Sequence, residues 1–175
     1  MRHVSTLLTL CAAVSLSLSA IAQSSTSTGL STATCNFDSE KQVAVQYEPM
    51  SLGKHDQEVF GGKIPYGKVW EPGRRALTLF TNTPLSVGGR EIPIGAYTIY
   101  FVPQRDQWTL IVSKNTDPGV GYDESKDLAR VSMQTGQLPS PEPDFSVYFA
   151  HTNPTRCSMR VDLADTRAWV PFEQK

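Results

Sequence analysis

The sequence predicts an all-β protein, an antiparallel β-sandwich (alternatively a flattened barrel) with long loops and at most one short helix. Three observations support this fold class. Apolar and polar side chains alternate with a period of two in many short segments, as in half-buried strands. Turn signals recur about every 8–12 residues, which is typical of sandwiches and barrels. Outside the first 22 residues, no sustained apolar period of about 3.6 residues predicts a long helix.

The clearest stretch is residues 85–113, where we expect a β-meander. Gly88-Gly89 lies between Val87 and Arg90 and predicts a two-residue hairpin turn, because both glycines can take positive φ. Gly95 predicts a bend or bulge before the next strand. Strands are expected at residues 96–102 and 108–112, joined by a polar turn. In the first of these, alternate side chains should face opposite ways: Tyr97, Ile99 and Phe101 on one side, and Thr98, Tyr100 and Val102 on the other.

The other strands follow from the same alternation, and we expect about ten short strands in total. Asp123 is expected to cap a short helical turn over residues 124–128. Residues 49–76 and 114–128 are long irregular connections, and proline-rich residues 138–143 predict a stiff connector. We expect residues 164–166 to close the last two strands against each other. The remaining expected strands are residues 35–37, 43–48, 77–81, 129–133, 145–150, 157–163 and 167–172.

Residues 1–22 have the pattern of a signal peptide. Arg2 and His3 give a basic start, residues 7–18 are an apolar run, and Ala20-Ile21-Ala22 predicts cleavage after Ala22. The run is too short, and too rich in serine, for a membrane anchor, which needs about 20 apolar residues. Residues 23–34 are small and polar and predict a flexible leader, and residues 35–175 predict a single domain. We therefore expect a periplasmic or secreted protein with no transmembrane segment in its mature chain.

Cysteine content and charge fit this location. Cleavage would remove Cys11 and leave Cys35 and Cys157, and an even pair in an exported chain predicts a disulfide. This bond should bring the first and last strands together and could contribute about 4–5 kcal/mol in the chain-entropy view. The net charge is −1, so the composition gives no reason to expect nucleic acid or an anionic membrane surface as a partner.

Several distinctive motifs follow one another along the chain. They are Ile64-Pro65-Tyr66-Gly67-Lys68-Val69-Trp70 with Gly73, Val87-Gly88-Gly89, Ile94-Gly95-Ala96-Tyr97-Thr98, Trp108-Thr109-Leu110-Ile111 with Lys114, Tyr122-Asp123, Asp127-Leu128-Ala129-Arg130-Val131, and Asp165-Thr166-Arg167. Together, over about residues 34–172, they resemble the exported bacterial family catalogued as domain of unknown function 2911. The resemblance implies a compact exported domain and transfers no activity. After the tryptophan, members of that family commonly read Gly-Ala-Asn-Glu-Ala-Thr. This chain reads Gly73-Arg74-Arg75-Ala76-Leu77-Thr78, so Arg75-Ala76 replaces Asn-Glu.

Common catalytic and metal motifs are missing from the sequence. His55 and His151 have no second ligand at metal spacing, and Gly119-Val120-Gly121 is too short for a phosphate loop. The disulfide would account for both mature cysteines, and no G-x-S-x-G elbow precedes a helix. The sequence therefore predicts no metal site and no cofactor.

The best candidate site lies in the long loop. Tyr66 and Trp70 are close in sequence to Arg74 and Arg75, with Tyr122 expected across from them. Aromatic faces beside guanidinium groups suit sugars, aromatic ligands or carboxylates. The alternative is structural: the two aromatic side chains plug the loop onto the sandwich while the arginines are solvated.

Two functions remain open on the sequence alone. The first is a non-catalytic binding or structural domain whose partner is a small molecule, a glycan or a protein. The second is an enzyme, such as a hydrolase of cell-envelope material, whose carboxylates and histidines converge only in the fold. A cleft that gathers a histidine with two carboxylates would favour the enzyme, and a groove lined by aromatic side chains would favour binding.

Overall fold

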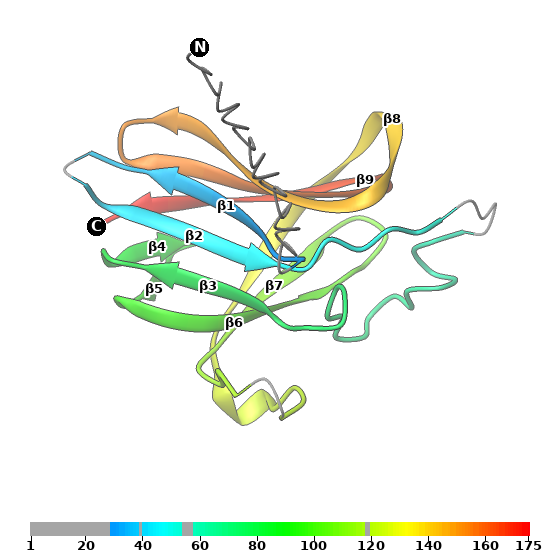
Figure 1. The fold of residues 1–175 in the computed structure, drawn as a ribbon, viewed down its shortest axis with the longest axis horizontal. Helices are drawn as coiled ribbons and strands as arrows, with labels where there is room; N and C mark the ends of the chain where they lie inside the picture. The colour runs from blue at the N-terminus through cyan, green and yellow to red at the C-terminus, as the bar shows by residue number, and fades with distance from the viewer. Residues whose placement is uncertain (1–28, 39, 54–57, 118–119) are drawn as a thin grey trace, which may run out of the picture.

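Figure 1 shows a computed structural model of the protein, which describes residues 29–38, 40–53, 58–117 and 120–175. The expected signal peptide, most of the expected leader, and His55 lie outside the described residues. The described chain forms nine strands and one short 3₁₀ helix. Within it, no helix has the length and apolar character needed to cross a membrane.

The elements follow the chain in the order shown by the colours of Figure 1. They are β1 (Ser31–Asn36), β2 (Gln42–Tyr47), β3 (Leu77–Thr81), β4 (Leu85–Val87), β5 (Arg90–Ile92), β6 (Gly95–Val102), β7 (Trp108–Ser113), the 3₁₀ helix η1 (Glu124–Lys126), β8 (Asp127–Asn153) and β9 (Arg156–Gln174).

The strands form one antiparallel sheet that folds over itself into two layers. Its order is β1-β2-β3-β6-β7-β8-β9-β4-β5, with β1 and β5 at the two ends, so the described sheet does not close into a barrel. The first part of β8 pairs with β7, and the rest of β8 pairs with β9, which continues to β4 and β5. Strand β8 thus belongs to both layers. The predicted all-β antiparallel fold is confirmed.

The core lies between the layers and is built by the alternation that the sequence shows. In β2, Val43 and Val45 are fully buried, and in β3 Leu77 and Leu79 are as well. They share one apolar cluster with Phe145, Val161 and other side chains of β8 and β9. Strand β6 is buried on both faces: Tyr97, Ile99 and Phe101 join the main core, whereas Tyr100 and Val102 join a small outer cluster with Ile111 and Tyr122.

The predicted meander is correct in its strands, in its turns and in two of its pairings, β4 with β5 and β6 with β7, but wrong in the pairing between β5 and β6. Gly88 and Gly89 have φ of 54° and 79°, and Val87 pairs with Arg90 as a two-residue hairpin requires. However, β5 does not pair with β6, because β6 lies between β3 and β7 in the other layer. The chain changes layer at Pro93-Ile94, where a proline without a backbone N–H cannot extend the ladder.

Two predictions about the last strands are also wrong. Residues 164–166 do not close a hairpin, because β9 runs on through them, and the true turn joins β8 to β9 after Asn153. Residues 138–143 are not a separate connector but part of β8. The pairing shifts there from Gln137 opposite Thr166 to Glu142 opposite Ala164, so the prolines lie in a wide bulge. A bulge tolerates proline because no ladder hydrogen bond is required there.

The disulfide joins β1 to β9 across the two layers. Cys35 and Cys157 are both fully buried, 122 positions apart in sequence, with Cα atoms 6.4 Å apart. The predicted bond is confirmed, and it clamps the edge strand β1 onto the opposite layer. The expected start of the domain needs correction: β1 begins at Ser31, and residues 31–34 pair with β2 rather than forming a leader. Small polar side chains suit this edge, since only one face of β1 meets the core.

The predicted helical turn is confirmed in shortened form. Asp123 caps η1, and its carboxylate accepts a hydrogen bond from the Ser125 backbone N–H at 2.9 Å. A hydrogen bond from the Ser125 hydroxyl, and then this backbone one, lower the pKa of Asp123.

Candidate functional site

A cleft of about 740 Å³ opens where the bulges of β8 and β9 meet the long loop after β2. One wall consists of residues 141–143 of β8 and 164–166 of β9. The other wall comes from loop residues on both sides of 54–57, and Arg105 contributes from the turn between β6 and β7. Among its described lining residues, the polar and aromatic side chains are Glu58, Phe60, Tyr66, Arg105, Glu142, Asp165 and Thr166.

Tyr66 is fixed by the backbone of its own loop. Ile64 N–H donates to Val59 O at 2.7 Å, and Gly67 N–H donates to Pro103 O at 2.9 Å, which ties the loop to the end of β6. The Tyr66 ring lies against Gly61, where an added Cβ would be 2.5 Å from its Cε2 atom. Gly61 also has a φ of +91°, so the close approach of ring and backbone requires glycine there.

Arg105 extends over the Tyr66 ring. Its Cζ atom lies 5.2 Å from the ring centroid, within cation–π range. The turn that carries Arg105 is anchored by the Thr135 hydroxyl, which donates to Asp106 O at 2.8 Å. No carboxylate among the described residues lies within ion-pair distance of Arg105. Its guanidinium therefore keeps donors for a bound molecule.

The cleft carries more acceptors than donors. The described lining contains three carboxylates, those of Glu58, Glu142 and Asp165. It contains one guanidinium, that of Arg105, so its net charge is negative. An adjoining hollow of about 390 Å³ shares Arg105, Asp165 and Thr166 with the cleft and extends it along β8 toward Gly136. Carboxylates accept hydrogen bonds from hydroxyl and amino groups and repel anions. The arrangement therefore favours neutral or cationic ligands that have many hydroxyl or amino groups.

Trp70 is half-buried, packs against the core and does not line this cleft. It exchanges two backbone hydrogen bonds with Phe101, of 2.7 and 3.0 Å, in line with β3. Its ring meets Trp108 and Phe145 edge-to-face at centroid distances of 5.9 and 5.6 Å. These contacts support the structural interpretation for Trp70: it holds the long loop on the sandwich.

Arg74 and Arg75 line a different hollow, of about 470 Å³, together with Glu48 and the start of the described chain. Arg74 donates from Nη2 to Glu48 Oε1 at 2.6 Å, although 89% of its side chain is exposed. This hydrogen bond lowers the pKa of Glu48 and raises that of Arg74. The structure thus places the predicted Tyr66 and the two predicted arginines in separate hollows.

Tyr122 lies on the outer face of β6, away from the core that Trp70 joins. Its ring meets Tyr100 edge-to-face at 5.2 Å. Its hydroxyl donates to Asp127 Oδ2 at 2.8 Å and accepts from Arg130 at 2.8 Å. Burial, and next the hydrogen bond to Asp127, raise the pKa of Tyr122. These contacts hold η1 and the start of β8 on the sheet, which is a structural role.

Comparison with known proteins identifies one family. A family model described as a protein of unknown function, DUF2911, matches residues 29–172. The chain belongs to the DUF2911 family. No curated protein and no solved structure matches it. The family match includes all described residues that line the cleft, so the cleft is part of the DUF2911 domain itself.

An ion pair that no sequence pattern indicated supports the cleft of this DUF2911 protein. Asp162 is 4% exposed and accepts from Arg167 Nε at 2.8 Å and Nη2 at 2.6 Å. Tyr148 donates to the same carboxylate at 3.2 Å. The hydrogen bonds to Asp162 hold the pKa of Arg167 above its usual value. The pair flanks Asp165 and Thr166, which line the cleft; only the Asp165-Thr166-Arg167 motif marked this region in the sequence.

His151, the other histidine of the expected mature chain, does not line the cleft. His151 Nε2 lies 3.8 Å from Cys35 Sγ, beside the disulfide. Among the described residues, Cys35, His151 and Cys157 form the one group of three or more His, Cys, Asp or Glu side chains whose ligand atoms converge, all within 4.8 Å of one another. Sequence spacing missed this cluster because its members come from β1, β8 and β9.

Proposed function

We propose that this DUF2911 protein is exported and acts as a non-catalytic binding domain for a small, hydroxyl-rich ligand such as a glycan fragment. The ligand would occupy the cleft between Tyr66, Arg105 and Asp165. The observation that carries the proposal is Arg105, which is held over an aromatic ring and has no carboxylate partner among the described residues.

The chemistry of the cleft supports this class of ligand. A guanidinium offers a planar fork of donors, and carboxylates such as Glu142 and Asp165 offer acceptors, so a ring with several hydroxyl groups could satisfy both. The partly buried Tyr66 adds an apolar surface. The volume of about 740 Å³ falls within the range of about 300–1,000 Å³ found for small-molecule sites.

Export is supported by two independent features. The first is the signal-peptide pattern of residues 1–22. The second is the buried disulfide, because disulfides persist in oxidising compartments such as the periplasm and the extracellular space. Detection of the protein outside the cytoplasm, with a mature N-terminus at Gln23, would test both the location and the predicted cleavage site.

A thermal-shift and calorimetric screen of the exported protein tests the binding function. Neutral oligosaccharides at ten times their Kd should stabilise the fold by about 1.4 kcal/mol, which raises Tm by a few degrees. Arg105→Ala and Tyr66→Ala should each weaken binding at least tenfold. Arg75→Ala is the matched control, because it removes an exposed arginine from another hollow.

Two outcomes would contradict the proposal. One is that no neutral or cationic glycan shifts Tm at millimolar concentration. The other is that a glycan binds Arg105→Ala as tightly as the unaltered protein.

A glycan hydrolase is a second candidate, supported by the three carboxylates Glu58, Glu142 and Asp165 in one cleft. Glycosidases generally use a pair of carboxylic acids on either side of the bond that is cleaved. A glycan that binds should then be cleaved, and Glu142→Gln or Asp165→Asn should abolish cleavage while binding persists. Intact glycan after prolonged incubation would exclude this candidate for that ligand.

A further inference from the structure

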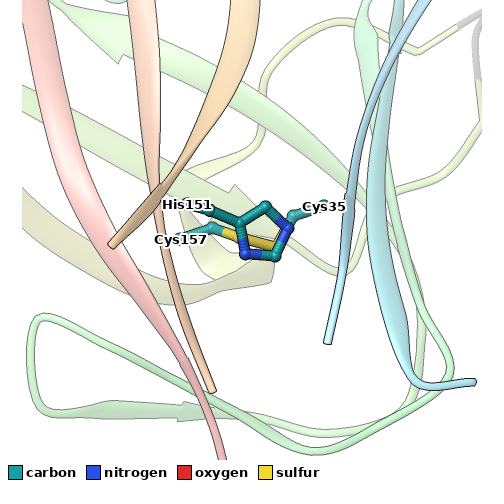
Figure 2. Close-up of side chains that lie close together, drawn as sticks. All are labelled: Cys35, His151 and Cys157. Atoms are coloured by element: carbon teal, nitrogen blue, oxygen red, sulfur yellow. A yellow bond between two sulfur atoms is a disulfide. The ribbon is translucent and has the colours of Figure 1, made fainter. Parts of the chain in front are cut away.

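Three strands bring one imidazole and two sulfur atoms together at the edge of the sandwich. His151 and Cys157 are directly opposite each other in the β8–β9 ladder, so their side chains share one face. Strand β1 supplies Cys35 from the other layer. Figure 2 shows the imidazole of His151 directly against the disulfide.

We propose that reduction of the Cys35–Cys157 disulfide converts this cluster into a three-donor site for a thiophilic metal cation of the Zn²⁺ or Cu⁺ kind. The ligands would be the two cysteine sulfurs and the imidazole of His151. Thiolate and imidazole donors suit these cations, and a disulfide with no free thiolate does not. The oxidation state of the pair therefore decides whether metal binds.

In the observed structure, two of the three ligand atoms already lie at nearly the separation that a bound zinc ion requires. Zinc–sulfur and zinc–nitrogen bonds of about 2.3 and 2.0 Å place the two ligand atoms about 3.5–3.7 Å apart in tetrahedral or trigonal geometry. The distance from His151 Nε2 to Cys35 Sγ is 3.8 Å. Once the sulfur–sulfur bond is broken, only the two thiol side chains need to separate, and their Cα atoms are already 6.4 Å apart.

The surroundings distinguish the site from a surface cysteine pair. Both cysteines are fully buried, whereas His151 is exposed and lies next to a bulge between His151 and Asn153. A cation could thus enter from the histidine side and keep one coordination position open to solvent. Three protein ligands with an open position are typical of reactive rather than structural zinc sites.

The redox step balances with a dithiol reductant. The reductant gives two electrons and two protons, the Cys35–Cys157 bond breaks into two thiols, and the reductant becomes a disulfide. Metal binding then releases the two thiol protons, because the cation binds thiolates. The bound cation would replace the covalent bond as the clamp between the two layers.

The experiment uses the full chain with Cys11→Ser in every protein, so that only the two buried cysteines can react. After reduction with a phosphine, Co²⁺ serves as a spectroscopic probe, because thiolate ligation gives intense near-ultraviolet charge-transfer bands. We expect one equivalent of Co²⁺ to bind the reduced protein and none to bind the oxidised protein. Zn²⁺ should displace it, and competition with a Cu⁺-selective chelator tests Cu⁺.

The variant His151→Ala separates a built site from two accidental thiols. It keeps the disulfide and should fold normally when oxidised, but after reduction it should bind the cation at least tenfold more weakly. Near-ultraviolet circular dichroism monitors the fold throughout. The proposal is overturned if reduced His151→Ala binds as well as the parent, if reduced parent protein binds neither Zn²⁺ nor Cu⁺, or if reduction unfolds the domain even when the cation is present.

Discussion

Asp162 and Arg167 are five residues apart in one strand, and their side chains form a two-pronged ion pair on the same face of β9. In a regular strand, residues five apart point to opposite faces and lie about 17 Å apart. The bulge between them makes the contact possible: Ala164 has a φ of 53°, which resets the alternation. The ion pair thus holds the bend that places Asp165 and Thr166 in the cleft.

Arg167→Ala should destabilise the protein by about 3 kcal/mol, because it leaves the buried carboxylate of Asp162 without its charge partner. Urea unfolding followed by tryptophan fluorescence measures the change. Arg160→Ala is the control: Arg160 also contacts the Tyr148 ring, at 5.9 Å, but forms no ion pair among the described residues. Equal losses in both variants would show that the ion pair does not support the bend.

Ala164→Gly should stabilise the protein by about 1 kcal/mol, since glycine adopts positive φ without the clash that a Cβ causes. Ala168→Gly in the same strand is the matched control. Ala168 is fully buried in a regular part of β9, so glycine there should cost about 0.5–1 kcal/mol. Thermal or urea unfolding of the two variants should give changes of opposite sign.

Gly88→Ala should be more destabilising than Gly89→Ala. Both glycines have positive φ, so each alanine costs about 1–2 kcal/mol of backbone strain. A Cβ at Gly88 would also clash with Val131 Cγ1, whereas at Gly89 nothing lies within 4 Å. Overpacking adds about 1–3 kcal/mol at Gly88 alone. If the two variants unfold at the same urea concentration, the turn does not pack on β8 as described.

Trp70→Ala should destabilise the fold by about 3 kcal/mol, the lower end of the range for large aromatic residues, because Trp70 is only half-buried. Its neighbour Val69 is 36% exposed, and Val69→Ala should change stability by less than about 0.5 kcal/mol. Limited proteolysis adds a second readout: loss of the Trp70 contacts should make residues 58–70 more easily cleaved. An unaffected cleavage rate would contradict the role of Trp70 as the plug of this loop.

Arg74→Ala should lower stability at neutral pH and have no effect in acid. Arg74 holds the pKa of Glu48 below its ordinary value of 4.5 in the folded state. A lowered folded-state pKa stabilises the protein above the unfolded-state pKa, and the contribution is lost as the pH falls through the folded-state pKa. The difference in urea midpoint between parent and variant should therefore shrink below about pH 4.5.

Arg75→Ala is the charge-matched control for this pH series, since Arg75 acts on Glu48 only through longer-range attraction. Its urea midpoint should differ little from that of the parent at every pH. Because the Arg74 side chain of this pair is 89% exposed, the effect of Arg74→Ala should also fall with added salt. A difference that persists at pH 2 would mean that Arg74 stabilises the fold by packing rather than by charge.

The local features of this protein could be predicted from its amino-acid sequence. The alternation in β2 and β3, the two-glycine turn after Val87 and the Asp123 cap are set by residues within a few positions of one another, so pattern and φ preference were enough. The disulfide followed from a count rather than from local pattern, since Cys35 and Cys157 are the only cysteines left after the expected cleavage. The two-layered antiparallel fold then follows from burying the apolar faces of many short strands.

The pairing of the strands and the convergence of side chains could not be predicted in the same way, because both depend on long-range packing. Whether β5 pairs with β6 or only with β4 depends on how the two layers pack. The two-residue link at Pro93-Ile94 is compatible with both arrangements, so its sequence does not distinguish them. Bulges are equally difficult to predict from sequence. The register shifts near Glu142 and Ala164 change which side chains face the cleft, but they depend on strand pairing and leave no clear pattern in the sequence. Arg105 and His151 reached their sites through such long-range contacts, because strands far apart in sequence share one core.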